Sequence, residues 1–486
     1  MMNNLRNKTL NAVGWRGLVD IGEQILLIIF TAILARLLTK EDFGLIAMAL
    51  LVNRFVYVMT QVGFSTAIIQ GHEITESQVS AIFFIQLAIG FSTSIICHLL
   101  SPFAAEFFHA PKLVPVIQTL SWLLFLNSLT FPMVFLQKKV KFRGLSLLEI
   151  GAMLVSNAVG IIMAFLGFGM WALVSRLMIH RVLFTIGVWP LVRWKPAWPC
   201  LSGTKKIFNF GLKMYFSNIA SYFSHNVAAI IVGRYLGVET LGSFNIAYNL
   251  AIVPAEKVRV ILAAALFPAF SLISENITKL KKAYYESLLI TNIFFIPLML
   301  GVAAISTDLV RFIYGEKWKD AGYFLSALSF VGLMKGIEQI SKTMYLAKGW
   351  ANVNLLVAGL ETICSLPLMY VGMKNWGIEG LIFAYLTSTI LALVLNIYYS
   401  QKAIDDDKVF FKAIYKSVIA AVVMYIGVSL YRDLFFMNLT LHLITQIFVG
   451  AIIYCILRTM LLSKPEKNII SQLSFFQYAF KKMSMR

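Results

Sequence analysis

Ionisable side chains stand inside strongly apolar stretches at several places in this 486-residue sequence. Such groups are costly in lipid, so they usually face a water-filled cavity or an ion partner. The cations that we predict to bind a ligand are Arg16, Arg54, Arg176, Arg181, Lys257 and Arg259. Acids in the same setting are Asp20, Glu23 and Glu361, and the stretch near 319–346 carries Lys335, Glu338 and Lys342. A cavity lined by cations suits an anionic solute, most simply a diphosphate or an acidic sugar.

The positions of these charges along their helices leave a second interpretation open for some of them. Arg16, Asp20 and Glu23 follow an i, i+4, i+7 spacing, which places them on one helix face. Arg54 lies about twelve residues from a helix end, near the bilayer midplane at about 1.5 Å per residue. Cations near helix ends can instead extend into the head groups. Arg16, Arg36, Lys213, Arg234 and Lys342 are in that position, and Lys257 can pair with the neighbouring Glu256.

The elements that must position these groups are membrane-spanning helices. The chain is 59% hydrophobic and 13% charged, with a mean hydropathy of +0.78, and its apolar runs are long enough to cross a bilayer. We predict an all-α polytopic membrane protein with about fourteen spans. The spans lie near 14–38, 43–69, 79–101, 113–137, 145–166, 169–191, 207–236, 241–273, 284–306, 319–346, 352–373, 376–399, 412–430 and 439–462.

An internal repeat predicts how the spans are grouped. Residues 33–44 align without gaps on residues 231–242, with Ile, Arg, Leu, Glu and Gly at matching places. The offset relates the first span to the seventh, and an even number of spans per repeat makes the repeats parallel. We therefore predict two six-helix lobes related by a pseudo-two-fold axis. The predicted divisions are a first lobe over 1–191, a cytoplasmic connector over 192–206, a second lobe over 207–400, and two extra helices with a basic cytoplasmic tail over 401–486.

The charge distribution predicts the orientation of the chain and argues against other functions. Lys and Arg concentrate in the loops that are cytoplasmic when both termini are inside, so the net charge of +19 predicts membrane topology rather than nucleic-acid binding. The four cysteines are scattered and form no metal-ligand spacing. We find no P-loop, nucleophile motif or catalytic carboxylate pair, and predict no enzyme activity, cofactor or metal.

Several segments resemble bacterial polysaccharide exporters, the oligosaccharide flippase branch of the multidrug/oligosaccharidyl-lipid/polysaccharide superfamily. They are ARLLTKEDFGLIAMA (35–49), FLQKKVKFRGLSLLEI (135–150), GFGMWALV (167–174), FNFGLKMYFSN (208–218), GRYLGVETLGSFNIAYNLAIVP (233–254) and LFPAFS (266–271). The likeness is greatest to colanic-acid and teichuronic-acid exporters, and it weakens after about residue 400.

The resemblance implies a transporter that flips undecaprenyl-diphosphate-linked repeat units across the bacterial inner membrane by alternating access. It implies that Arg54, with Lys257 or Arg259, contacts the diphosphate. Many relatives carry an acid in the middle of span seven where this chain has Ala228, so Asp20, Glu23 or Glu361 would have to serve any ion coupling. We expect the partners to be membrane lipids and the lipid-linked glycan, with a polymerase and a chain-length regulator as further candidates, and the protein to be monomeric.

Two alternatives stay open at this stage. One is a membrane glycosyltransferase or polymer ligase, although such enzymes usually need a larger outer loop than the one near Ser306–Lys319. The other is a cation-coupled efflux pump for small molecules.

Overall fold

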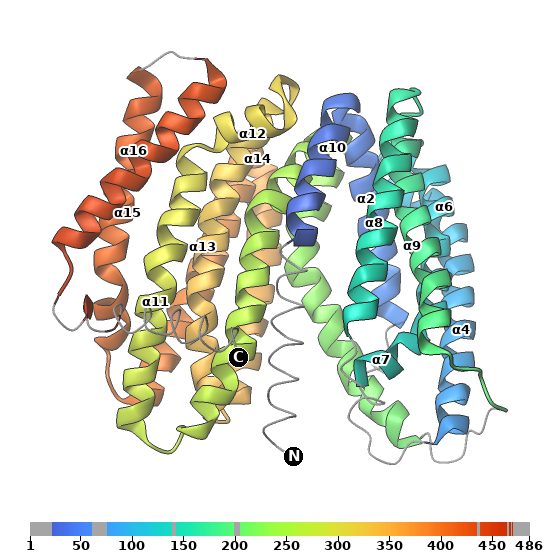
Figure 1. Ribbon diagram of the computed structural model, residues 1–486, viewed down its shortest axis with the longest axis horizontal. Helices are drawn as coiled ribbons and strands as arrows, with labels where there is room; N and C mark the ends of the chain where they lie inside the picture. The colour runs from blue at the N-terminus through green and yellow to red at the C-terminus, as the bar shows by residue number, and fades with distance from the viewer. Residues whose placement is uncertain are drawn as a thin grey trace, which may run out of the picture. The chain divides into compact units, whose positions relative to one another are not determined.

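The computed structural model describes residues 22–60, 75–138, 142–198, 205–434, 438–463, 466–467 and 469. Arg16 and Asp20 lie outside these ranges. All regular secondary structure in the described ranges is helical, which confirms the predicted all-α class. The chain packs as two compact units, Met1–Asn245 (unit 1) and Ile246–Arg486 (unit 2), whose helices are labelled in Figure 1.

Unit 1 is a bundle in which neighbouring long helices run side by side. A first helix covers 22–37. It is followed by α2 (Lys40–Thr60), α4 (Glu76–Leu99), α5 (Ser101–Phe107), α6 (Leu113–Leu129), η1 (Phe131–Met133), α7 (Val134–Lys138), α8 (Phe142–Phe165), α9 (Met170–Val192) and the first part of α10 (Lys205–Leu272). The helix pairs α4–α6 and α8–α9 pack along each other, and α2 contacts both α6 and α9.

Unit 2 is built around α11 and α13. It contains the rest of α10, then α11 (Ile277–Ala304), α12 (Ser306–Tyr314), η2 (Glu316–Trp318), α13 (Lys319–Ala347), α14 (Ala351–Ile404), α15 (Val409–Leu434) and α16 (Leu439–Met460). The α11 helix packs against α13 and α15, α13 packs against α14, and α15 packs against α16. The polar residues considered below lie mainly on α10, α13 and α14.

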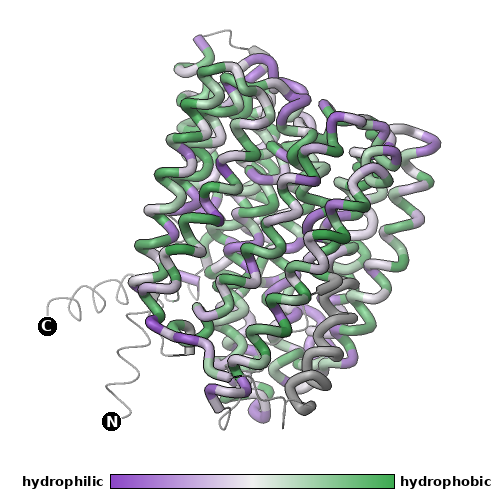
Figure 2. Tube along the Cα trace, turned by 90° about the vertical axis from the view of Figure 1, so that its right-hand side faces the viewer, coloured by the Kyte–Doolittle hydropathy of each residue, from purple (hydrophilic) through white to green (hydrophobic). Residues whose placement is uncertain are grey.

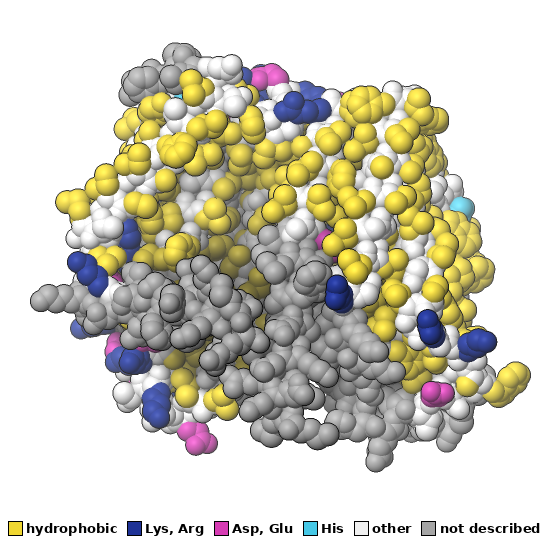
Figure 3. All heavy atoms as spheres, viewed as in Figure 1, with side chains coloured by type: hydrophobic (Ala, Val, Ile, Leu, Met, Phe, Trp, Pro, Cys, Tyr) yellow, Lys and Arg dark blue, Asp and Glu magenta, His cyan; other side chains and the backbone are white. Residues whose placement is uncertain are grey.

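The predicted spans fall on helices, but their number stays a prediction. Within the described residues, seven helices are long and apolar enough to cross a membrane. Other predicted spans coincide with α2, α6, α10 and α13, which are shorter or carry more charge. Figure 2 shows hydrophobic residues along most of the helical trace, with hydrophilic residues at helix ends and at several places within the helices. In the view of Figure 3, hydrophobic side chains cover much of the described surface, as expected for contact with lipid.

Two helices each join two predicted spans across a kink at a glycine. The backbone of Gly237 in α10 has φ 81°, and that of Gly377 in α14 has φ 61°. These angles are strained for residues with a Cβ, so glycine is required there. In α14 the chain reverses so tightly that a Cβ on Gly380 would lie 2.1 Å from the carbonyl oxygen of Gly372. Each of these long helices therefore consists of two helical segments, which coincide with two predicted spans.

The boundary between the two packed units follows Asn245. It lies later in the chain than the end of the first lobe at residue 191, which the repeat predicts. The first part of α10 packs within unit 1, where the Tyr222 hydroxyl donates to the Leu51 carbonyl oxygen at 2.8 Å. The repeat still has a structural counterpart in this unit. The break between the first helix and α2 lies at Leu38–Thr39, and Thr39 aligns with Gly237, the kink of α10. The lobes over 1–191 and 207–400 stay a prediction.

Candidate functional site

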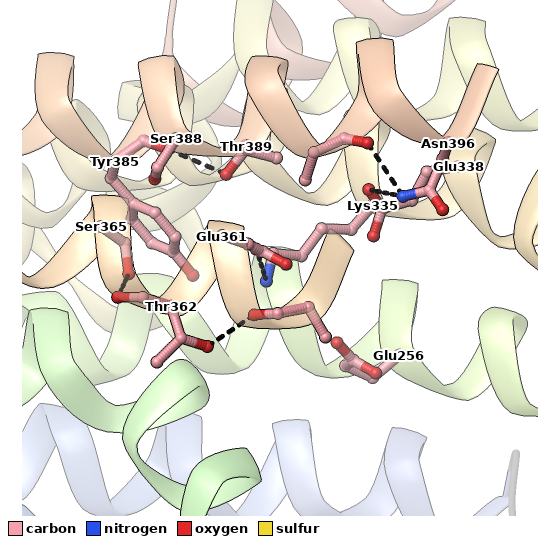
Figure 4. A network of polar contacts seen from close by, with 12 residues as sticks. Glu256, Lys335, Glu338, Glu361, Thr362, Ser365, Tyr385, Ser388, Thr389 and Asn396 are labelled. Carbon is pink, nitrogen blue, oxygen red and sulfur yellow. Dashed lines mark hydrogen bonds and ion pairs between the residues drawn. The ribbon is translucent and has the colours of Figure 1, made fainter. Parts of the chain in front are cut away.

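A buried lysine on α13 is the centre of a polar network inside unit 2 (Figure 4). The side chain of Lys335 is 8% exposed, and its Nζ lies 3.5 Å from Oε1 of Glu361 on α14. The same Nζ lies 5.9 Å from the centre of the Tyr385 ring, on the second half of α14. Because a buried charge is stable only with a partner, this ion pair fixes the middle of α13 against the first half of α14.

A second carboxylate on α13 is held by α14. Glu338 is 6% exposed, and its Oε2 accepts a hydrogen bond from Nδ2 of Asn396 at 3.3 Å. The Tyr345 hydroxyl donates to Oδ1 of the same asparagine at 2.8 Å. Asn396 therefore connects a carboxylate and a phenol that are about two turns apart on α13.

A guanidinium on α10 extends the network to a third helix. Nη1 of Arg259 lies 2.5 Å from Oε1 of Glu256 on the same helix, and its Nε donates to Oε1 of Gln339 on α13 at 3.3 Å. The backbones can approach here because α13 has a glycine at the contact: a Cβ on Gly332 would lie 3.4 Å from the carbonyl oxygen of Ala251. Small residues thus bring Arg259 within reach of α13.

The formal charges of this network balance. Its cations are Arg259, Lys335 and Lys342, and its carboxylates are Glu256, Glu338 and Glu361. Of these cations, the sequence analysis predicted Arg259 as an anion contact. In the structure Arg259 and Lys335 already have carboxylate partners, so an anion can reach either one only by competing with an acid. Lys257 lies apart on the exposed side of α10, while its neighbour Glu256 is paired with Arg259.

Hydroxyl groups of α14 lie around the Lys335–Glu361 ion pair. Ser365 donates to the Thr362 carbonyl oxygen at 3.2 Å, and Thr389 donates to the Tyr385 carbonyl oxygen at 2.9 Å. Each hydroxyl uses its proton on its own helix and keeps its oxygen as an acceptor. Carboxylate and hydroxyl oxygens in one place can hold a proton or a small hard cation.

Unit 1 carries the other predicted cations on two packed helices. Arg54 is exposed on α2, and α2 contacts α9, where Arg176 and Arg181 are half-buried. Nη1 of Arg176 donates to Oδ1 of Asn157 on α8 at 3.4 Å. Arg181 is within electrostatic range of Tyr57 on α2 and of the Glu149 carboxylate on α8. Unlike Arg259, these side chains have no carboxylate within ion-pair distance in the described part of the chain.

The remaining predicted residues lie elsewhere in unit 1. Glu23 is half-buried on the helix over 22–37. Arg36 and Arg234 occupy matching positions of the repeat. Both lie near helix ends, where a side chain can extend into the lipid head groups. Arg36 is exposed, and the guanidinium of Arg234 contacts His109 and lies over the Phe107 ring, 5.3 Å from its centre.

Gln339, Tyr345 and Asn396 were not among the residues predicted from the sequence. The signal for Asn396 was present, because it is an amide in the apolar run LALVLNIYY (391–399). Its partner on another helix could not be read from the sequence.

A helical membrane bundle with paired charges in its interior is the architecture of a membrane transporter. Comparison with known families is specific: residues 33–323 match the polysaccharide biosynthesis protein family. This match covers more than half of the chain, and the chain belongs to that family.

Individual relatives extend the match over most of the sequence. The chain is 25% identical over 410 residues to the lipopolysaccharide biosynthesis protein WzxC of Escherichia coli (strain K12), covering 82% of each chain. It is 26% identical over 477 residues to the succinoglycan biosynthesis transport protein ExoT of Rhizobium meliloti (strain 1021), covering 95% of this chain and 94% of that one. The fold is similar to that of the lipid II flippase MurJ in an inward closed conformation, with a TM-score of 0.72 and 16% identity, covering 91% of this chain and 98% of that one.

Proposed function

We propose that this protein flips undecaprenyl-diphosphate-linked oligosaccharide repeat units across the bacterial inner membrane for surface polysaccharide synthesis. The observation that carries the proposal is a charged network within a helical membrane fold similar to that of a lipid II flippase, in a chain of the polysaccharide biosynthesis family. Relatives named for succinoglycan transport and lipopolysaccharide synthesis support the same substrate class. The protein would act by alternating access and without covalent chemistry, with both termini in the cytoplasm.

In this proposal the cations contact the diphosphate and acidic groups of the glycan. Arg54 and Arg176 support this role because no carboxylate lies within ion-pair distance of them among the described residues. Arg181 is a further candidate that lies within electrostatic range of Glu149. Arg259 would bind the substrate only after leaving Glu256. Arg16 and Lys257 are further candidates for anion contacts.

Glu361 is the strongest candidate for ion coupling. Its carboxylate contacts Lys335 and lies among the hydroxyl groups of α14, as Figure 4 shows. Uptake of a proton or cation by Glu361 would weaken its attraction for Lys335, which gives the network two states. Asp20 and Glu23 are alternative coupling residues.

Deletion of the gene tests the proposal. The deletion strain should lose its surface polymer and accumulate the lipid-linked repeat unit in the inner leaflet, and wild-type protein should restore export. Normal export without such accumulation would refute the function. Sugar transfer by the purified protein would instead identify a glycosyltransferase, and drug sensitivity with a normal surface polymer would identify an efflux pump.

A further inference from the structure

A long apolar groove lies on the lipid-facing side of unit 2, away from the charged network. It has a volume of about 840 Å³, and its walls come mainly from α11, α15 and α16. Phe294 and Leu298 of α11 line the groove. The adjacent Phe295 and Met299 face α13, because a Cβ on Gly336 would meet the Phe295 ring and one on Gly332 would meet Cε of Met299. The α11 helix therefore separates the groove from the charged network.

One end of the groove is closed by a buried arginine. Arg458 of α16 lines the groove and is 4% exposed. Its Nη1 lies 3.3 Å from Oε2 of Glu466, and its guanidinium also interacts with the Tyr454 hydroxyl, one turn earlier on α16. Its Nε and Nη2 have no hydrogen-bond partner within 3.5 Å among the described residues. A buried guanidinium with two unused donors is costly unless an anion or another acceptor occupies the site.

The surroundings of Arg458 keep a positive balance. Lys416 of α15 shares the same acid, with Nζ 3.2 Å from Oε1 of Glu466. One turn earlier on α15, Lys412 lines a second cavity of about 320 Å³ together with Lys281 and Lys282 of α11. Lys281 pairs with Asp406 and Lys282 lies 4.0 Å from Glu286, so Lys412 adds to the surplus of cations. Figure 3 shows several Lys and Arg side chains at this end of unit 2.

We propose that this groove and its basic end bind an anionic glycerophospholipid of the membrane. An acyl chain would lie in the groove, and the phosphate would accept hydrogen bonds from Nε and Nη2 of Arg458, with Lys282 and Lys412 near the rest of the head group. Bilayers supply both parts of this ligand, and basic pockets between membrane helices bind such head groups. The site holds a resident lipid rather than the transported one, because α11 separates it from the charged network and Glu466 fixes the guanidinium. This role for α15 and α16 does not depend on the proposed function.

Native mass spectrometry of the full-length protein tests the site. The protein in detergent is titrated with phosphatidylglycerol or with phosphatidylcholine of the same acyl chains. Wild type should bind phosphatidylglycerol at least about tenfold more tightly, since a phosphate with a net negative charge completes the charge-assisted hydrogen bonds. Arg458→Gln should remove this preference, and Lys416 remains in that variant to pair with Glu466. Equal affinity of wild type for both lipids, or an unchanged preference in Arg458→Gln, would overturn the proposal.

A second pair of variants separates lipid binding from folding. Ala451 lines the groove, so Ala451→Phe should fill it and lower the affinity for both lipids while Arg458 stays in place. The neighbouring Ile452 is exposed on α16 and is not part of the groove lining, so Ile452→Phe should bind as wild type does. Equal loss in both variants would overturn the site. Displacement of phosphatidylglycerol by an equimolar amount of undecaprenyl phosphate would also overturn it, by assigning the groove to the carrier lipid.

Discussion

Gly44 of α2 and Gly242 of α10 occupy equivalent positions of the internal repeat, and each lies against the backbone of the other segment. A Cβ on Gly44 would lie 1.9 Å from the carbonyl oxygen of Val238, and a Cβ on Gly242 would lie 2.4 Å from that of Lys40. Lys40 and Val238 are themselves equivalent in the repeat. The contact is therefore reciprocal, as at a two-fold axis.

Gly242→Ala should destabilise the protein, because the added Cβ collides with backbone that cannot rotate away. Overpacking of this kind costs about 1–3 kcal/mol of unfolding free energy, so the Tm of the purified protein in detergent should fall. Gly151→Ala is the matched control, because nothing lies within 4 Å of a Cβ there, and it should be neutral or slightly stabilising. Equal Tm values for the two variants would show that the crossing is not closely packed.

Lys335→Met should lower stability more than the double variant Lys335→Met/Glu361→Gln. The single change leaves a partly buried carboxylate without its cation, at a cost of about 3 kcal/mol, whereas removal of both charges can be nearly neutral. Lys282→Met removes a mostly exposed cation that lies 4.0 Å from Glu286 and should change stability by less than about 1 kcal/mol. Thermal unfolding of the four proteins measures this, and a double variant as unstable as the single one would contradict the ion-pair role.

Arg54→Ala should lower polymer export at least about tenfold while the amount of protein in the membrane stays normal. The side chain is exposed, so its loss leaves no buried acid unpaired, but it removes a cation proposed to contact the diphosphate. Arg36→Ala, at the exposed end of the preceding helix, is the control and should export normally. Export in a complemented deletion strain measures both. The assignment of Arg54 to substrate contact fails if the two variants export alike.

Asp406→Asn should remove a small stabilisation that depends on pH. The loop carboxylate of Asp406 pairs with Lys281, and that hydrogen bond, together with one from the Lys408 backbone N–H, lowers the pKa of Asp406 below its usual value. A lowered folded-state pKa means that the stabilisation is complete above the unfolded-state pKa, about 3.9, and is lost as pH falls through the folded-state value. The contribution should stay below about 1 kcal/mol, because both side chains of the pair are partly exposed to solvent.

Thermal unfolding from pH 7 to pH 3 checks this expectation. Wild type should be slightly more stable than Asp406→Asn at pH 7, and the two Tm values should converge at the acid end. A difference that grows as the pH falls would contradict the sign of the shift.

Helix positions were predictable from the sequence because an apolar segment long enough to cross a bilayer satisfies its own backbone hydrogen bonds by forming an α-helix. The kinks at Gly237 and Gly377 also have a local cause. The partner of each buried charge was not predictable, because it depends on how three helices pack. Arg259 was predicted to face a ligand, yet it pairs with Glu256 three residues earlier. Asn396 joins Glu338 across 58 residues of sequence, and periodicity alone does not indicate such a contact.

The balanced charges of the network imply that a bound anion would compete with carboxylates of the protein itself. An anion that contacts Arg259 or Lys335 would replace Glu256 or Glu361 as the partner of that cation. Its affinity would therefore be reduced by the free energy of the ion pair that it breaks. The carboxylates that stabilise these cations would in this way also limit how tightly the network holds an anion.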